Sequence, residues 1–360
     1  PPNNRDIWTA IRPDPNHVYL IGLTGGTTGL SKGVPRTYND HILCGYGWCK
    51  AQQLTSNDVG LVLTPAGHNL AHVCVMFPML LEGGTTVIAN VPNPDRTMEI
   101  VHNTKSTFLW CVPAQLARMM QSPNFDKYDL SSLRFVGSGG SHVPAELVRG
   151  VNEKIGCDFV NGFGMIEGPC TCTRLWDSFE TKCNTIGISC APYDEFKVID
   201  PSTEAELPRG KEGELVSKGP GVFQGYFKTS REDLYTMDGF FRSGDLAVID
   251  AEGNLRITGR IKDVINRGGE MISAREIEEL MMTHPSVVEA AAIAMPCKDL
   301  GERVCLYVKP KDGVAGLTLE DVQKHCQAAG LAKFQWPERV ENLQDLPLTN
   351  VGKPDKKLMR

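Results

Sequence analysis

Short apolar runs recur along the first half of the chain, and each is followed by glycine and polar residues. The clearest runs occupy residues 18–22, 59–63, 85–89 and 108–112, and their length and β-branched content predict strands. A helix is predicted over residues 113–120, because a proline suits the first helical position. Strands that alternate with helices predict a mainly parallel sheet covered on both faces. Binding sites in such sheets gather in the loops after strands.

The pattern changes in the second half of the chain. Residues 196–200 and 213–219 read as strands with polar turns between them and no helix. Further on, a capping box from Ser273 to Glu276 predicts a helix that ends before Pro285. Two more strands and a helix that ends at a glycine complete this last region.

These patterns predict an α/β protein in three parts. We expect a large α/β part with a mainly parallel sheet at residues 1–190 and a small β-rich part at residues 191–261. A compact α+β part follows at residues 262–360, after a stretch dense in charges and glycines that marks the main boundary or is simply a basic linker.

Composition describes an ordinary soluble protein of 360 residues, with 41% hydrophobic and 22% charged residues. The net charge of -6 argues against a general nucleic-acid or membrane-surface binder. It does not exclude a polyanion such as ATP, because local lysines and arginines decide such a site. No apolar run reaches the roughly eighteen residues that span a membrane, and no signal peptide is recognised, so we expect a cytoplasmic location.

The twelve cysteines carry no C-x-x-C pair, and Cys170 and Cys172 are too closely spaced for the usual structural zinc site. We expect reduced, mostly buried thiols.

The loop after the first strand combines glycines and threonines with one lysine. Its residues are Thr24, Gly25, Gly26, Thr27, Thr28, Gly29 and Lys32. Glycines let backbone N–H groups approach phosphate oxygens, and the lysine supplies countercharge. The Walker pattern is not met, because Ser31 precedes Lys32. The loop predicts a phosphate site of another kind, or alternatively a structural hairpin.

Other loops offer further candidates. Glu167 lies among glycines, either as a turn residue or as a hard oxygen ligand for Mg²⁺. Asp245 follows a glycine, as a turn residue or as an acceptor for ribose hydroxyls. His68 and His72 are four residues apart, but Asn69 stands where a zinc protease has its catalytic glutamate, which disfavours a metal site.

Near the C-terminus, Lys353 lies in a glycine turn, whereas Lys356 and Lys357 are expected at the surface.

Taken in order, these stretches resemble the motifs of the adenylate-forming superfamily of acyl-CoA synthetases and adenylation domains. The first loop is similar to T-[SG]-G-[ST]-T-G-x-P-K-G, with Ser31 at the proline position. Further matches lie at residues 161–168, 243–245, 259–270 and 347–353. The sequences at 34–40 and 266–270 narrow the resemblance to stand-alone aryl-acid adenylating enzymes such as 2,3-dihydroxybenzoate-AMP ligases.

The resemblance implies roles for individual residues. It implies that Lys353, Lys32 and Glu167 are catalytic, with Glu167 assisting Mg²⁺. Residues expected to contact ATP or AMP are Thr24, Gly25, Gly26, Thr27, Thr28, Gly29, Gly139, Gly140, Gly162, Phe163, Gly164, Asp245 and Arg260. Residues expected at the acyl pocket are His68, Asn69, Leu70, Cys74, Gly162 and Cys170. Asp263 is expected to act as the hinge, and Gly268 and Gly269 to face the arriving thiol.

The implied reaction joins a carboxylic acid, of the hydroxybenzoate type, to AMP with release of pyrophosphate. The acyl group then passes to a pantetheine thiol of CoA or of an aryl-carrier protein. ATP and Mg²⁺ are the implied cofactors, and siderophore biosynthesis is the implied setting.

Two alternatives stay open. Leu70 and Cys74, in place of an aromatic wall, keep open an acyl-CoA synthetase for another cyclic or aliphatic acid. The resemblance also implies that the sequence begins where the first subdomain of the family has already ended. A non-catalytic nucleotide-binding fragment is therefore the alternative of a different class.

Overall fold

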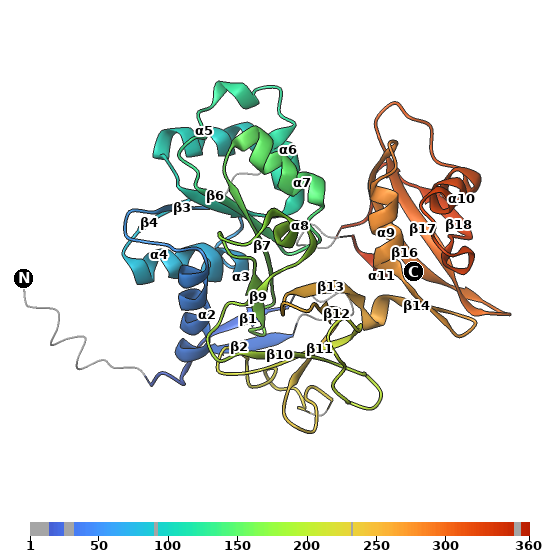
Figure 1. Ribbon diagram of the computed structural model, residues 1–360, viewed down its shortest axis with the longest axis horizontal. Coiled ribbons are helices and arrows are strands. Elements are labelled where there is room, and N and C mark those ends of the chain that lie inside the picture. Colours follow the sequence, from blue (N-terminus) through green and yellow to red (C-terminus); the bar gives the residue numbers. More distant parts are fainter. Residues whose placement is uncertain (1–13, 25–31, 90–92, 232, 349–353) are drawn as a thin grey trace, which may run out of the picture.

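The computed structural model describes residues 14–24, 32–89, 93–231, 233–348 and 354–360, which form four β-sheets with helices packed on them (Figure 1). The smallest sheet is a hairpin of β1 (Val18–Leu23) and β2 (Gly33–Thr37), and it carries the glycine-rich loop between its strands. Helix α2 (Tyr38–Ala51) follows directly. A reciprocal cap between Thr37 and Asp40 fixes where this helix begins.

The largest sheet has seven strands in the order β4-β3-β5-β6-β7-β8-β9. They are β3 (Val59–Val62), β4 (Thr85–Ile88), β5 (Phe108–Cys111), β6 (Phe135–Gly139), β7 (Asp158–Gly164), β8 (Cys170–Cys172) and β9 (Ile188–Ser189). The strands from β4 to β7 pair in parallel, and β8 and β9 extend the sheet antiparallel. The prediction of a mainly parallel sheet is confirmed.

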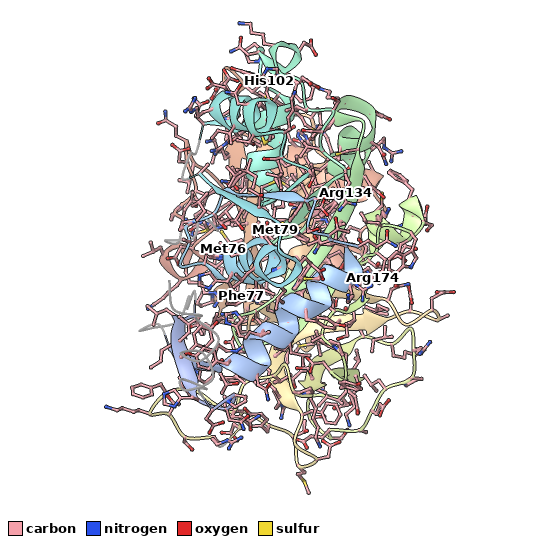
Figure 2. The ribbon with its side chains drawn as sticks, turned by 90° about the vertical axis from the view of Figure 1, so that its left-hand side faces the viewer. Met76, Phe77, Met79, His102, Arg134 and Arg174 are labelled. Atoms are coloured by element: carbon pink, nitrogen blue, oxygen red, sulfur yellow. The ribbon has the colours of Figure 1, made fainter. Side chains whose placement is uncertain are left out.

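Helices cover both faces of this sheet. They are α3 (Asn69–Ala71), α4 (Phe77–Glu82), α5 (Pro94–Thr104), α6 (Pro113–Met120), α7 (Ala145–Gly150) and α8 (Phe179–Asn184), in addition to α2. Neighbouring strand residues point to opposite faces. Leu109 belongs to an apolar cluster with α5, α6 and α7, whereas Trp110 belongs to a second cluster with α2 and α4. Figure 2 looks onto this second face, where α2 lies in front and Phe77 and Met79 lie beside it.

The second half of the chain begins with an antiparallel sheet of β10 (Glu195–Ile199), β11 (Gly213–Lys218), β12 (Phe241–Ile249) and β13 (Leu255–Arg260). Val198, Leu215, Ala247 and Leu255 form its core. As the sequence predicts, no helix separates these strands in the part of this region that is described.

The last sheet lies to one side of the others in Figure 1. Its strands are β14 (Val264–Arg267), β15 (Glu270–Ser273), β16 (Val287–Cys297), β17 (Gly301–Pro310) and β18 (Arg339–Asn342), and its helices are α9 (Ala274–Met282), α10 (Leu319–Ala328) and α11 (Lys356–Met359). Strand β18 pairs parallel to β17, and the other pairs are antiparallel. Ile265, Ile277, Leu306 and Val322 lie in its core.

The predicted capping box of α9 forms only in part. Ser273 Oγ accepts a hydrogen bond from the backbone N–H of Glu276, as expected. The Glu276 carboxylate, however, accepts a hydrogen bond from Gln335 instead of returning to the cap. A tertiary partner thus replaces the local one.

Ten of the twelve cysteines are buried, in agreement with the expectation of mostly buried thiols. Within the described ranges, every helix is too short or too polar to cross a lipid bilayer.

Candidate active site

The glycine-rich loop is closed at its base by two hydrogen bonds. The backbone N–H of Thr24 donates to the Lys32 carbonyl at 3.0 Å, and the Lys32 N–H donates to Thr24 Oγ1 at 3.1 Å. Gly25, Gly26, Thr27, Thr28 and Gly29 lie outside the described residues. Lys32 extends from the loop base, with its Nζ 4.6 Å from the centroid of the Tyr226 ring.

Glu167 lies in the loop between β7 and β8 and is buried. Its Oε1 accepts a hydrogen bond from the Tyr226 hydroxyl at 2.8 Å, and its carbonyl accepts one from the N–H of Phe223 at 2.8 Å. Burial, followed by the nearby Glu167 charge, raises the pKa of Tyr226, so the phenol stays protonated and donates. Tyr226 therefore touches both Lys32 and Glu167.

One carboxylate is enough for Mg²⁺ that also binds substrate phosphates, but it is too few for a metal ion bound by protein side chains alone. Among the described residues, no group of three or more His, Cys, Asp or Glu side chains could hold a metal ion. Mg²⁺ commonly takes one or two protein carboxylates and completes its shell with substrate phosphates and water. Glu167 next to a phosphate-type loop fits this mode, in which the metal arrives with the nucleotide.

Four glycines and one aromatic residue lie at the ends of β6 and β7. A Cβ on Gly139 would lie 2.4 Å from the Gly162 carbonyl, so only glycine permits the two strand ends to approach. Gly140 has a φ of 85°, which lets the chain turn away after β6. Phe163 packs against the core of the β10–β13 sheet, and Gly164 ends β7.

Asp245 and Arg260 are brought together. They face each other across β12 and β13, and Arg260 Nε donates to Asp245 Oδ1 at 2.9 Å. The Asp245 side chain is 3% exposed, whereas that of Arg260 is 46% exposed. Asp245 thus lies within a strand and not in a turn, and a cation holds its carboxylate in place.

The predicted acyl residues lie at the end of β3 and on the second face of the sheet. His68 caps α3 through Nδ1, which accepts from the Leu70 N–H. Asn69 donates from Nδ2 to the Met165 carbonyl at 3.4 Å, so it contacts the Glu167 loop. Leu70 packs against the apolar cluster that contains Cys74 and Cys170, both of which are buried.

The predicted hinge residue Asp263 is bound by the C-terminal segment. Arg360 donates to its Oδ1 at 3.1 Å, and Lys356 Nζ lies 4.0 Å from its Oδ2. Lys356 also pairs with Glu278 at 2.7 Å, and its side chain is only 18% exposed. The expectation that Lys356 lies at the surface is therefore wrong, because two carboxylates draw it inward. Lys357 is exposed as expected.

Lys353 lies outside the described residues. Gly268 and Gly269 form the turn between β14 and β15 with φ values of 62° and 96°, where glycine is favoured.

The chain matches two family models along most of its length. A family model described as AMP-binding enzyme matches residues 3–227. A second model, AMP-binding enzyme C-terminal domain, matches residues 276–353. The chain belongs to the AMP-binding enzyme family.

Relatives of this AMP-binding enzyme include 2,3-dihydroxybenzoate-AMP ligase of Bacillus subtilis (strain 168), which is 36% identical over 95% of the chain and 64% of the relative. Salicylyl-CoA synthase / salicylate adenylyltransferase of a Streptomyces species is 36% identical over 97% of the chain and 64% of the relative. The crystal structure of ATP-bound MatB from Rhodopseudomonas palustris matches with a TM-score of 0.88 and 29% identity, over 97% of the chain and 69% of that protein. The motif resemblance and the fold class are confirmed. The chain spans 64% of the length of both curated relatives.

Two residues of this AMP-binding enzyme escape sequence reasoning. Tyr226 lies in a loop where a tyrosine has no distinctive signal. Arg36 follows the glycine-rich loop and looks like a surface cation, yet it is fully buried. Its guanidinium donates to Asp40 at 2.7 Å, to the Ile166 carbonyl at 2.5 Å and to the Gly221 carbonyl at 3.1 Å. Arg36 thus ties the hairpin to the Glu167 loop and to the segment that carries Tyr226.

Two cavities lie away from this site. Cavities of about 280 and 460 Å³ lie along the β10–β13 sheet, and none of the predicted site residues lines them.

Proposed function

We propose that this AMP-binding enzyme activates a carboxylic acid by joining it to AMP, and then transfers the acyl group to a pantetheine thiol. The observation that carries the proposal is the contact of Tyr226 with both Lys32 and Glu167. It brings the cation of a glycine-rich loop and a buried carboxylate to one place. A triphosphate with its metal needs this combination of charges.

In the first half-reaction a carboxylate oxygen of the acid attacks the α-phosphorus of ATP. The bond from that phosphorus to the pyrophosphate oxygen breaks, and a mixed anhydride with AMP forms. The reaction depends on positioning and on stabilising charge. Lys32 and the loop that begins at Thr24 would bind the departing phosphates, and Lys353 would stabilise charge at the α-phosphate.

Glu167 would hold the Mg²⁺ that accompanies ATP. When bound, this ion neutralises phosphate charge. Tyr226 would keep the Glu167 carboxylate oriented toward it. Asp245 would accept hydrogen bonds from the ribose hydroxyls, with Arg260 beside it.

In the second half-reaction a thiol attacks the acyl carbon and AMP leaves. We propose that residues 262–360 move at Asp263 between the two half-reactions. This motion would withdraw Lys353 and bring Gly268 and Gly269 toward the thiol. The contacts of Asp263 with Arg360 and Lys356 lie within the moving part and would hold the hinge residue to it.

The acid is proposed to be an aryl acid of the hydroxybenzoate type, and the acceptor to be CoA or a carrier protein. The names of the two relatives support this class, since they refer to 2,3-dihydroxybenzoate and to salicylate. One observation favours a second candidate, an acyl-CoA synthetase for another cyclic or aliphatic acid. Leu70 packs against the apolar cluster that contains buried Cys74, so neither of these two positions supplies an aromatic ring for stacking.

The test is acid-dependent exchange of labelled pyrophosphate into ATP, over salicylate, 2,3-dihydroxybenzoate, benzoate, cyclohexane carboxylate and medium-chain fatty acids. Exchange with a hydroxybenzoate is the expected result. Exchange with only the other acids would replace the first candidate by the second. ATP binding without any exchange would refute both and leave a nucleotide-binding protein. Adding CoA to the active acid then tests for thioester formation.

A further inference from the structure

A hydrogen-bonded chain of side chains runs from the hairpin through α2 to the Glu167 loop. The Tyr19 hydroxyl lies 2.7 Å from His41 Nδ1. His41 Nε2 lies 3.0 Å from Asn69 Oδ1, and Asn69 Nδ2 lies 3.4 Å from the Met165 carbonyl. His41 has no exposed surface, so both ring nitrogens depend on these partners.

The carbonyl at one end fixes the direction of every bond in the chain. The Met165 carbonyl only accepts, so the amide nitrogen of Asn69 faces it and Oδ1 faces His41. His41 Nε2 must then carry the proton and donate. In a neutral imidazole Nδ1 is consequently an acceptor, and the Tyr19 hydroxyl donates to it.

Charge does not disturb this arrangement at ordinary pH. Burial, and then the charge of Arg36, lowers the pKa of His41 to about 3. Burial raises the pKa of Tyr19 to about 12. Both side chains therefore remain neutral, and the proton stays on His41 Nε2.

In this arrangement Asn69 can offer a ligand only a hydrogen-bond donor, the second N–H of its amide. Its Oδ1 is occupied by His41, and one hydrogen of Nδ2 is directed at Met165. The second hydrogen of Nδ2 has no acceptor among the residues that the structure describes. Asn69 is partly exposed at the end of β3 and contacts the loop that carries Glu167.

We propose that Tyr19 and His41 are positioning residues, which hold the Asn69 amide so that it offers a hydrogen-bond donor to the acid. This inference rests on the proposed function. Acids that carry an oxygen acceptor where they face Asn69 are selected over acids that carry an N–H donor there, because a donor opposite a donor leaves both unpaired.

Salicylate and 2-aminobenzoate are the probes that separate these two cases. The hydroxyl of salicylate donates to its own carboxylate, and its oxygen remains an acceptor. The amino group of 2-aminobenzoate offers N–H donors, since its lone pair is delocalised into the ring. Benzoate, with neither group, is the reference.

Four proteins are compared: the unaltered chain, His41→Phe, Tyr19→Phe and the control Tyr38→Phe. His41→Phe retains an aromatic ring, which packs edge-on against Phe77 with ring centroids 5.0 Å apart in the unaltered chain. Tyr38 stacks on Tyr19 with ring centroids 4.6 Å apart but is not part of the hydrogen-bonded chain, so its variant removes a hydroxyl from the same pair of rings without breaking the chain.

The readout is kcat/KM for salicylate divided by kcat/KM for 2-aminobenzoate, measured by pyrophosphate exchange. The unaltered chain and Tyr38→Phe should give the same ratio, above one. The ratio should fall about tenfold in His41→Phe and about threefold in Tyr19→Phe, as expected for the loss of one orienting hydrogen bond. KM for ATP should stay constant, which a general loss of structure would not allow.

If the ratio of the two kcat/KM values were unchanged in both His41→Phe and Tyr19→Phe, the inference would be overturned. Exchange in the unaltered chain would still support the proposed function. A lack of exchange with every acid, even in the unaltered chain, would remove both. Nitrogen-15 spectra of the histidines provide a readout independent of activity and of variant folding. His41 should show a protonated Nε2 and an unprotonated Nδ1 from pH 5 to pH 8, and the opposite tautomer would also overturn the inference.

Discussion

Replacing Arg36 by methionine should destabilise the large α/β part more than any change of an exposed ion pair. Methionine fills a similar volume but cannot donate to Asp40 or to the Ile166 and Gly221 carbonyls. The Asp40 carboxylate would then be buried without its cation, since both side chains are almost fully enclosed. Breaking a buried ion pair on one side costs about 3 to 5 kcal/mol.

The two carbonyls add to this loss, because a buried acceptor without a donor costs about 1 to 3 kcal/mol. Local rearrangement relieves part of the sum, so we expect a decrease of about 4 kcal/mol in the free energy of unfolding. The assay is urea denaturation followed by tryptophan fluorescence, because Trp48 of α2 and Trp110 of β5 lie in the core.

Two matched variants make the Arg36 experiment decisive. Arg96→Met removes an exposed arginine that pairs with Glu99, and it should cost no more than about 0.5 kcal/mol. The double variant Arg36→Met/Asp40→Asn removes the orphaned charge while its amide oxygen can still cap α2. It should recover about 1 to 2 kcal/mol relative to Arg36→Met alone. A loss in Arg36→Met no larger than that in Arg96→Met would refute the reasoning.

Four further predictions concern single side chains. Tyr226→Phe should raise the Mg²⁺ concentration for half-maximal exchange about tenfold. Tyr235→Phe, whose hydroxyl donates to the Phe223 carbonyl, should leave that concentration unchanged, and equal behaviour of the two variants would count against Tyr226. Lys353→Ala should lower adenylation about a hundredfold to a thousandfold with Lys357→Ala as the control, and near-normal exchange would overturn its role. Asp263→Pro should spare adenylate formation and block thioester formation. The control Arg360→Ala, which removes one partner of the same aspartate, should retain both half-reactions. Equal loss of both half-reactions in Asp263→Pro would contradict a hinge at this residue. Burial raises the pKa of Asp194 to about 6. The protonated form of Asp194 stabilises the folded protein, and this contribution is lost as pH rises from about 4 to 6. In urea melts, Asp194→Asn should therefore be more stable than the unaltered chain by about 1 to 3 kcal/mol at pH 8 but not at pH 4.

The elements that sequence predicts well are those fixed by local pattern. The buried parallel strands β3, β5 and β6 are short apolar runs, and α10 begins at a Thr318 cap and ends before Gly330. Candidate site residues that follow a strand, such as Glu167, can be predicted from the same local pattern. Their partners are not, because the contacts are distant in sequence: Tyr226 lies 59 residues from Glu167, and Arg36 lies 130 residues from Ile166. A cation such as Arg36 or Lys356 reads as a surface residue until the fold shows which carboxylate faces it.

Tyr226 and Arg36 both hold the Glu167 loop, yet they should fail in different ways. Tyr226→Phe removes one hydroxyl and leaves a ring that packs on Phe223 with centroids 5.0 Å apart, so most of the buried apolar area is kept. The loss should therefore appear in the Mg²⁺ dependence and hardly in unfolding. Arg36→Met releases the hairpin, the Glu167 loop and the Gly221 carbonyl together, so stability and exchange should fall together. If the two variants instead lost activity and stability in the same proportion, Tyr226 would be part of the packing and not of the site.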